Sequence, residues 1–374
     1  MNVVWCSFRG QFSDSPRALY EALTRRRDDL THVWLASDER RSQFPPEVAT
    51  VGYGTPEARA TLESADVVVA NDHVDLDWDK RPGVVYLQTW HGTPLKRIHH
   101  DVRWAPEGRL ARLDRDVARW DAMLSPNPVS TPLLRKAFRF DGPAHETGYP
   151  RNDVLTSPDS GQLRAAVRRE LGIAEGTTAV LYAPTWRDDV VFAPESPDHH
   201  FPLDLADFAR ALGEEHVLLL RLHSLVGSRP EVAPGSPFRD VSAYPDIREL
   251  YLAADVLVTD YSSAMFDFAV TSRPILLFTY DLADYRDRLR GFYLDLEEIA
   301  PGPLLATSDQ VLTALRDLDA VVEAHADRYA RFRQTFDPHD DGHATDRVLD
   351  LFFPTRAAAP AASASTHGGG HRAG

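Results

Sequence analysis

The sequence contains a single cysteine, Cys6, among its 374 residues, so no disulfide can form within the chain. This scarcity favours a reducing compartment such as the cytoplasm. No apolar run approaches the roughly 20 residues that a membrane-spanning helix needs, and the N-terminus reads as a short strand interrupted by Arg9 instead of a signal peptide. The formal net charge of −15 argues against a general nucleic-acid binder, which needs a basic surface. We therefore expect a soluble or peripheral protein.

Three common chemical signatures are also missing: a P-loop, a GxGxxG fingerprint and the paired cysteines of a zinc site. Two stretches resemble metal-binding patterns but have simpler interpretations. DLDWD (75–79) reads as a solvated acidic turn, and DPHDDGHATD (337–346) reads as a loop followed by a helix cap. The sequence therefore predicts no metal ligands and identifies no cofactor, and it leaves a requirement for a divalent cation open.

What the sequence does contain is a regular alternation of β-branched runs and amphipathic helices, which predicts parallel sheets covered on both faces. We expect two Rossmann-like, doubly wound α/β domains, residues 1–147 and 148–353, the second ending in a helical segment. The stretch HETGYPRNDVLTSP (145–158) reads as the linker between them. Residues 354–374 are of low complexity and predict a disordered tail. Two such domains normally bind a ligand in the cleft between them.

The stretch VVYLQTWHGTPLKRI (84–98) ends a buried strand with a histidine and a glycine. A histidine in this place can accept a proton near neutral pH, and Gly92 would allow the backbone to approach a substrate. The alternative is a structural His91, hydrogen-bonded to the backbone beside a packed Trp90. His91 is the first candidate catalytic residue of this loop, and the further candidates are Gly92, Thr93 and Lys96.

The stretch DVLVTDYSSAMFDFAV (255–270) predicts a strand, a turn and the start of a helix. Free N–H groups and the positive end of the helix dipole make such a corner suitable for phosphate. The alternative is that Asp260 or Ser262 only caps the helix. The position at the carboxyl end of a strand favours a ligand role. The candidate donor-binding residues here are Thr259, Asp260, Ser262 and Ser263.

A second histidine, His223, ends the apolar strand of HVLLLRLHS (216–224), and Arg221 precedes it on the same face of that strand. A single strand-end histidine is more often structural. If the two sheets face each other, however, His91 and His223 converge on the cleft. Further strand ends contribute guanidinium groups that suit bidentate contact with phosphate, those of Arg151 and Arg187.

Together these stretches resemble the CDP-glycerol glycerophosphotransferases of teichoic acid synthesis. The resemblance covers most of residues 1–350 and is carried by QTWHGTPLKRI, SPNPVSTPLL, TGYPRND, YAPTWR, LLRLH and YPDIRELYLAADVLVTDYSSAMFDFAV. It implies a glycosyltransferase-B-like fold and a reaction in which an acceptor hydroxyl attacks the β-phosphorus of CDP-glycerol and CMP leaves. It also implies roles for individual residues: a general base at His91, a donor-phosphate contact at His223, and a diphosphate site at Ser262 and Ser263, with Arg187 and Arg290 as weaker candidates.

The resemblance further implies a lipid-linked polyol-phosphate or glycan acceptor beside CDP-glycerol. Residues 96–119 hold seven Lys and Arg against four acids, and we expect this basic stretch to contact anionic headgroups. The alternative there is a merely solvated helix face. The expected location is the cytoplasm, peripheral to the inner face of the cell membrane. Three functional alternatives stay open: a CDP-ribitol phosphotransferase, a nucleotide-sugar glycosyltransferase of the same fold, and a non-catalytic envelope-assembly protein.

Overall fold

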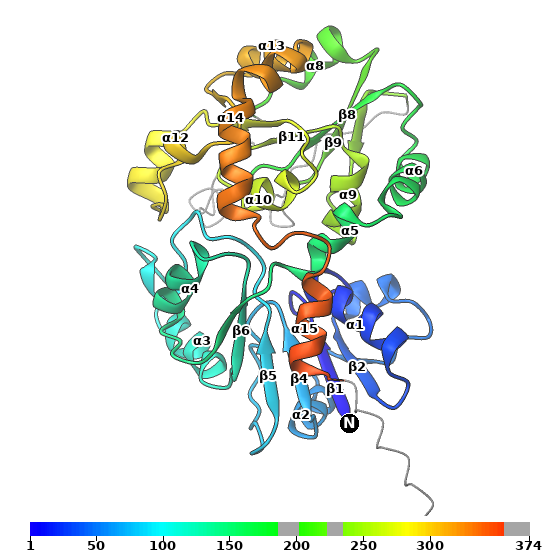
Figure 1. Cartoon of the computed structure of the whole chain (residues 1–374), viewed down its shortest axis with the longest axis vertical. Helices are drawn as coiled ribbons and strands as arrows, with labels where there is room; N and C mark the ends of the chain where they lie inside the picture. Colours follow the sequence, from blue (N-terminus) through cyan, green and yellow to red (C-terminus); the bar gives the residue numbers. More distant parts are fainter. Residues whose placement is uncertain (186–201, 223–234, 355–374) are drawn as a thin grey trace, which may run out of the picture.

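The computed structural model describes residues 1–185, 202–222 and 235–354 of the chain. These residues form two parallel sheets, one above the other along the long axis in Figure 1, and each sheet has helices on both faces. The predicted α/β fold with two doubly wound units and a helical C-terminal part is therefore confirmed. Three predicted features lie outside the described residues: Arg187, His223 and the tail from residue 355 onward.

The first sheet consists of β1 (Asn2–Cys6), β2 (Thr31–Ala36), β3 (Thr50–Gly52), β4 (Val67–Ala70), β5 (Val85–Gln88), β6 (Ala122–Ser125) and β7 (Ala144–Glu146). These strands pair in the order β3-β2-β1-β4-β5-β6-β7. Because successive side chains of a strand point to opposite faces, Val3 and Trp5 lie in one core cluster and Val4 and Cys6 in another.

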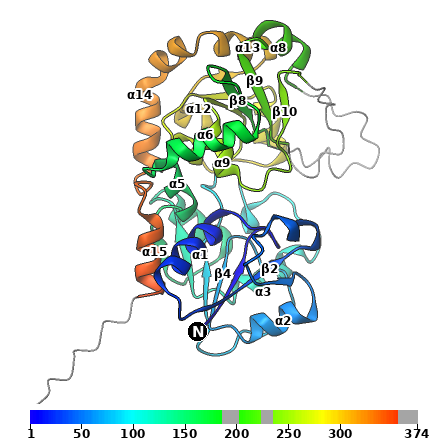
Figure 2. The ribbon, with the colours of Figure 1, turned by 90° about the vertical axis from the view of Figure 1, so that its right-hand side faces the viewer.

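Five helices cover this sheet: α1 (Asp14–Arg26), α2 (Pro56–Glu63), α3 (Arg109–Val117), α4 (Ser130–Phe138) and α15 (Ala344–Phe352). Apolar residues of α1 and α15 pack with Val3 and Trp5, whereas those of α2, α3 and α4 pack on the opposite face. The last helix that the structure describes, α15, thus completes the core of the first sheet, and Figure 2 shows α15 beside α1.

The second sheet consists of β8 (Thr178–Tyr182), β9 (His216–Leu220), β10 (Phe238–Asp240), β11 (Val256–Thr259), β12 (Ile275–Phe278) and β13 (Leu304–Leu305). These strands pair in the order β10-β9-β8-β11-β12-β13. One face is covered by α6 (Ser160–Glu170), α9 (Ile247–Ala253), α10 (Ala264–Ala269) and α14 (Leu318–Phe336). The other face is covered by α8 (Leu205–Leu212) and α13 (Ser308–Arg316).

The remaining described elements are the short helices α5 (Asp153–Thr156), α11 (Leu282–Asp284) and α12 (Leu296–Ile299), three 3₁₀ turns and one π-helical turn. The 3₁₀ turns are η1 (Asp38–Gln43), η2 (His99–Asp101) and η3 (Pro150–Asn152), and the π-helical turn is η4 (Tyr285–Leu289). Within the described ranges, no helix has both the length and the apolar character that crossing a membrane requires.

The stretch 145–158 differs from the expected linker, because much of it is packed inside the protein. Tyr149, Pro150, Arg151 and Asn152 are all buried, and η3 and α5 follow one another within the stretch. Arg151 forms ion pairs with residues of both halves, which explains why this connection is not exposed.

Candidate active site

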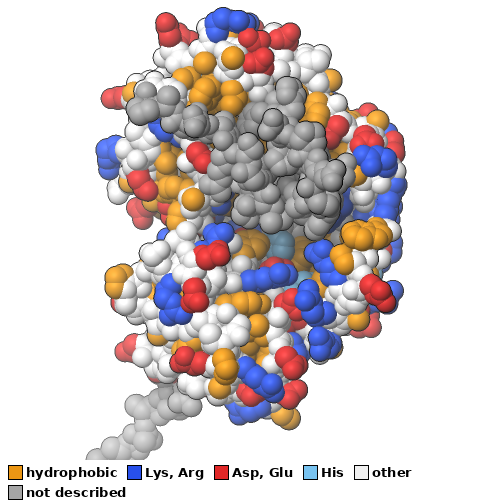
Figure 3. All heavy atoms as spheres, turned by 180° about the vertical axis from the view of Figure 1, so that it is seen from behind, with side chains coloured by type: hydrophobic (Ala, Val, Ile, Leu, Met, Phe, Trp, Pro, Cys, Tyr) orange, Lys and Arg blue, Asp and Glu red, His pale blue; other side chains and the backbone are white. Residues whose placement is uncertain are grey.

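The carboxyl ends of β5 and β11 meet between the two sheets. A Cβ atom added to Gly92, in the loop after β5, would lie 2.7 Å from the Oγ atom of Ser263, in the turn after β11. The absence of a side chain at Gly92 therefore allows the two loops to touch. Figure 3 shows histidine and cationic side chains in the hollow between the two halves, next to the segments that are not described.

The ring of His91 is held by the neighbouring strand of the first sheet. Its Nδ1 atom lies 2.5 Å from the backbone oxygen of Asn71, at the end of β4. A carbonyl oxygen only accepts hydrogen bonds, so Nδ1 donates and Nε2 carries the lone pair. The predicted alternative, a histidine bonded to the backbone beside Trp90, describes this contact correctly. The same contact also sets the tautomer that a general base requires.

The loops around His91 hold bulky residues in the left-handed backbone region. Trp90 has a φ of 52° and Phe8, in the loop after β1, a φ of 41°. The rings of both residues contact His91, with centroids 4.1 and 5.1 Å away. Such conformations cost about 1–3 kcal/mol each and persist where the surrounding packing enforces them. The backbone is therefore strained at the place where the imidazole ring is positioned.

In the second half, the polar atoms of Thr259 and Asp260 bind backbone groups. The hydroxyl of Thr259, which is fully buried, donates to the backbone oxygen of Ala183 at 2.7 Å. Asp260 is 1% exposed, and its Oδ1 accepts hydrogen bonds from the backbone N–H groups of Thr185 and Tyr261. These contacts join the ends of β8 and β11, and the predicted donor contacts of the two residues stay a prediction.

Ser262 and Ser263 are half-buried and precede α10, which begins at Ala264. The Oγ atom of Ser262 accepts a hydrogen bond from the backbone N–H of Ala264 at 3.2 Å, as the capping alternative predicts. Ser263 lies against Gly92 across the domain boundary. Ser263 is therefore the serine of this turn whose side chain is seen at the interface, whereas the hydrogen bond of Ser262 is with its own helix.

Two arginines predicted near the ligand are engaged elsewhere. The buried guanidinium of Arg151 binds the carboxylates of Asp14 in α1 and Asp267 in α10, at 3.3 and 2.8 Å. The Nη1 atom of Arg221 donates to three backbone oxygens, those of Val241, Ser242 and Tyr244. The guanidinium of Arg151 is buried and paired within the protein, whereas Arg221 is partly buried and is held through Nη1. A phosphate contact of either residue stays a prediction.

The chain following Thr93, itself buried, pairs with the other half through its backbone. Arg97 donates to the oxygen of Gly291 at 3.1 Å, and Tyr293 donates to the oxygen of Leu95 at 2.8 Å. The side-chain amine of Lys96 lies 3.5 Å from the Oγ1 atom of Thr185, between the two halves.

Arg290 directly precedes this paired segment. Lys96 and Arg290 are thus both carried by the segments that join the halves.

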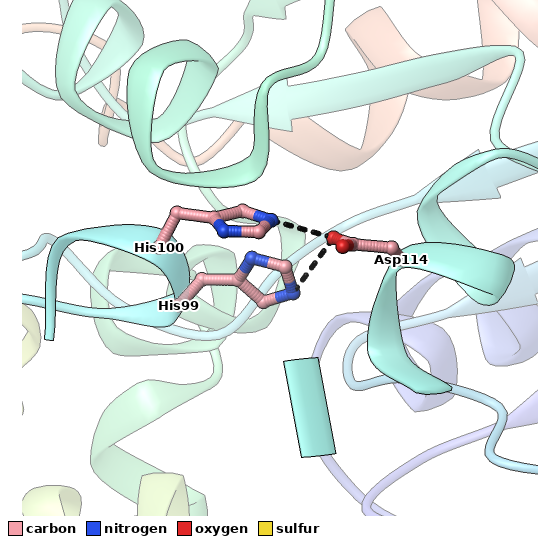
Figure 4. A group of neighbouring side chains, drawn as sticks. All are labelled: His99, His100 and Asp114. Carbon is pink, nitrogen blue, oxygen red and sulfur yellow. Dashed lines mark hydrogen bonds and ion pairs between the residues drawn. The ribbon is translucent and has the colours of Figure 1, made fainter. Parts of the chain in front are cut away.

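A histidine and aspartate group lies in the same part of the first half. His99 and His100 of η2 face Asp114 of α3, and Figure 4 shows the two rings pointing to one carboxylate. Burial, followed by the neighbouring His73 and His100, lowers the pKa of His99 to about 4, so its ring is neutral at pH 7. This is the one group of three potential metal ligands within the part of the chain that the structure describes.

Sequence reasoning did not identify the residues that support His91. Asn71 holds His91 through its backbone oxygen and the backbone N–H of Phe8 through its side chain, at 2.9 Å. The hydroxyl of Tyr149 accepts a hydrogen bond from the backbone N–H of Gly92 at 3.2 Å. The position of Asn71 at the end of a predicted strand was a usable signal. That Asn71 contacts His91 could be seen only once the structure showed that β4 pairs with β5.

Two doubly wound parallel units with a histidine and serines at facing strand ends define a two-domain protein of the glycosyltransferase-B-like class. Within that class, the chain belongs to the CDP-glycerol:poly(glycerophosphate) glycerophosphotransferase family, whose model matches residues 1–354. The family expected from the motifs is therefore confirmed.

The teichoic acid poly(glycerol phosphate) polymerase of Bacillus subtilis (strain 168) is 35% identical over 361 residues, which are 94% of this chain and 48% of the polymerase. The teichoic acid glycerol-phosphate transferase of Staphylococcus aureus (strain NCTC 8325 / PS 47) is 36% identical over 361 residues, 93% of this chain and 91% of the transferase. A solved structure of the wall teichoic acid polymerase TagF, in a variant soaked with CDPG, gives a TM-score of 0.86 at 33% identity and covers 94% of this chain and 88% of that chain. This chain thus spans about half the length of the Bacillus subtilis polymerase.

Proposed function

We propose that the protein transfers glycerol phosphate from CDP-glycerol to a hydroxyl of a teichoic-acid-type acceptor and releases CMP. The observation that carries this proposal is the geometry of His91. Its Nδ1 atom is bound by the backbone oxygen of Asn71, and its loop touches Ser263 of the other half. The loop of the proton acceptor His91 thus lies beside the turn that contains Ser262 and Ser263. The chain also belongs to a family whose description names glycerophosphotransfer.

In the proposed reaction, Nε2 of His91 takes the proton of the acceptor hydroxyl while its oxygen bonds to the β-phosphorus. The bond between the β-phosphorus and the bridging oxygen breaks, and its electron pair leaves with CMP. The product is a phosphodiester. The hydrogen bond from Nδ1 to Asn71 keeps the ring oriented and stabilises the positive charge that forms on it.

For the donor side, we propose that Ser262 and Ser263 contact the diphosphate of CDP-glycerol. Arg290 would add positive charge, and His223 and Arg187, which lie outside the described residues, would complete the site. Residues 148–353 would then bind the donor, and residues 1–147 would receive the acceptor. Ser263→Ala should raise the KM for CDP-glycerol more than it lowers kcat.

The test is release of CMP from CDP-glycerol, with CDP-ribitol and UDP-glucose in parallel, in the presence of a lipid-linked primer. His91→Asn should lower kcat by about 10²- to 10⁴-fold and still bind CDP-glycerol, because the base acts on the acceptor. His343→Asn, a change on an exposed side chain, is the control. Near-normal turnover of His91→Asn would refute the assignment of the base. Turnover with CDP-ribitol alone would indicate a CDP-ribitol phosphotransferase, and turnover with UDP-glucose alone a nucleotide-sugar glycosyltransferase. No turnover with any of the three donors would favour a non-catalytic envelope-assembly protein.

We also propose that α3 and the loop before it bind the inner face of the cell membrane, where a lipid-linked acceptor would be presented. Trp104 is 71% exposed, and Arg109, Arg112 and Arg115 are exposed next to it in the sequence. An exposed aromatic ring beside cationic side chains is typical of interfacial membrane contact.

Flotation with anionic liposomes tests this membrane contact. Arg109→Glu with Arg112→Glu should weaken it, whereas Arg25→Glu with Arg169→Glu, which changes the charge equally at exposed positions of α1 and α6, should not. Equal flotation of the two double variants would eliminate α3 as the contact surface.

A further inference from the structure

The turn η2 brings together two histidines and one carboxylate that the sequence analysis did not connect. The Nε2 atom of His100 lies 2.7 Å from Oδ1 of Asp114, and the Nε2 atom of His99 lies 3.9 Å from the same oxygen. One possible ligand atom from each of the three residues lies within 4.8 Å of the other two. Figure 4 shows that the histidines come from η2 and the carboxylate from α3, on opposite sides of the site.

His99 is the unusual member of this group. Its side chain is 2% exposed, and neither ring nitrogen makes a hydrogen bond within the described part of the chain. A buried polar atom without a partner costs about 1–3 kcal/mol. The backbone of His99 has a φ of 48°, a strained conformation for a residue with a side chain, and Figure 4 shows its ring pointing toward Asp114. His99 thus combines ring nitrogens that make no hydrogen bond in the described chain with a strained backbone, beside the carboxylate of Asp114.

We propose that His99, His100 and Asp114 form a binding site for one transition-metal ion of the zinc class. Imidazole nitrogens favour zinc, copper and nickel over magnesium or calcium, and a carboxylate oxygen is a common third ligand. With bonds of about 2.0–2.2 Å, the ligand atoms of a tetrahedral zinc site lie roughly 3.3 Å apart. The two distances from the histidines to the carboxylate, 2.7 and 3.9 Å, lie on either side of that value, and the ligand atoms of the two histidines lie within 4.8 Å of each other. Movements of less than about 1 Å would complete the site, with water in the fourth position.

The bound ion would position a loop and is not assigned to the reaction itself. It would tie η2 to α3. The same turn contains Asp101, whose carboxylate accepts a hydrogen bond from the hydroxyl of Tyr293 in the second half at 2.8 Å. The ion would therefore fix the segment through which the first half contacts the second. This inference does not depend on the identity of the donor or the acceptor.

The test uses the 374-residue chain carrying His367→Ala and His371→Ala, which remove two C-terminal imidazoles as competing ligands. After dialysis against a chelator, this reference protein is titrated with Co²⁺, followed by visible d–d absorption, and then with Zn²⁺ as competitor. We expect one Co²⁺ per chain, displaced by Zn²⁺. Asp114→Asn and His100→Gln should each weaken binding at least about tenfold, since even changes in the outer shell of a metal site cost about 10- to 100-fold.

His343→Asn is the matched control, because His343 and Asp346 form a second histidine–aspartate pair that lacks a third ligand in the described chain. This variant should bind Co²⁺ as the reference does. Zn²⁺ should raise the melting temperature of the reference but not that of Asp114→Asn, and the two should melt alike in chelator. Absence of Co²⁺ binding at millimolar concentration would overturn the proposal. Equal affinity of the reference, Asp114→Asn and His100→Gln would do the same.

Discussion

Arg151 joins the two halves of the protein through buried ion pairs, and Arg151→Ala should therefore be strongly destabilising. The guanidinium binds Asp14 in α1 at 3.3 Å and Asp267 in α10 at 2.8 Å, and it lies 4.2 Å from the ring centre of Tyr149. All four side chains are buried. Truncation would leave two carboxylates in the interior without their counter-charge.

The expected loss follows from that burial. Removing one partner of a buried pair costs about 3–5 kcal/mol, a large part of the total stability of about 5–15 kcal/mol. Arg26→Ala is the control, because Arg26 pairs with Asp346 and Asp350 at the surface and its loss should cost less than about 1 kcal/mol. The assay is urea denaturation, followed by circular dichroism at the same pH for both variants.

Equal urea midpoints for Arg151→Ala and Arg26→Ala would refute this reasoning. A second measurement separates charge from packing. Burial raises the pKa of Asp267, and Arg151 opposes that rise. Without Arg151 the carboxyl holds its proton to higher pH in the folded state, so stability is retained at low pH and lost as the pH rises. Arg151→Ala should thus be closer to wild type at pH 5 than at pH 8, and adding Asp267→Asn should recover part of the loss at pH 8.

Two further predictions follow from the same interface. Gly92→Ala places a Cβ atom 2.7 Å from the Oγ of Ser263 and should lower kcat/KM by about tenfold or more. The control is Gly161→Ala, at a position with open space, which should leave kcat/KM unchanged. Equal kinetics of the two variants would show that the loops do not need this close contact. Burial raises the pKa of Asp340 from 3.8 to about 7, so wild-type stability should fall as the pH rises through that window. Asp340→Asn keeps an oxygen that can accept the hydrogen bond from Asn152 and removes the charge. Its stability relative to wild type should therefore increase by up to about 4 kcal/mol between pH 4 and pH 8. Urea midpoints of the two proteins that run parallel across this range would show that Asp340 is not responsible for the pH dependence.

The amino-acid sequence by itself determined the fold and indicated candidate residues for the site. Apolar periodicity depends on neighbouring residues, so most of the longer strands and helices could be predicted. The strands β7, β10 and β13 have only two or three residues, too few to show a pattern, and were not predicted. A parallel arrangement then requires that functional groups lie at the carboxyl ends of strands. His91, Gly92 and Ser263 were predicted for this reason, from the break between an apolar run and polar or glycine residues. The motifs around them were specific enough to indicate the family.

The tertiary structure decided which polar groups meet. Arg151 binds Asp14 and Asp267, which are 137 and 116 residues away, so its guanidinium is engaged inside the protein. The backbone oxygen that orients His91 belongs to Asn71, because β4 pairs with β5. The last helix, α15, packs on the first sheet although it follows the second.

The meeting of His99, His100 and Asp114 likewise follows from where the fold places η2 and α3. Buried charges and hydrogen-bonding groups pair with whichever groups the fold places beside them. Residues that are far apart in the sequence can be neighbours in the fold, so these pairs could not be predicted from local sequence patterns.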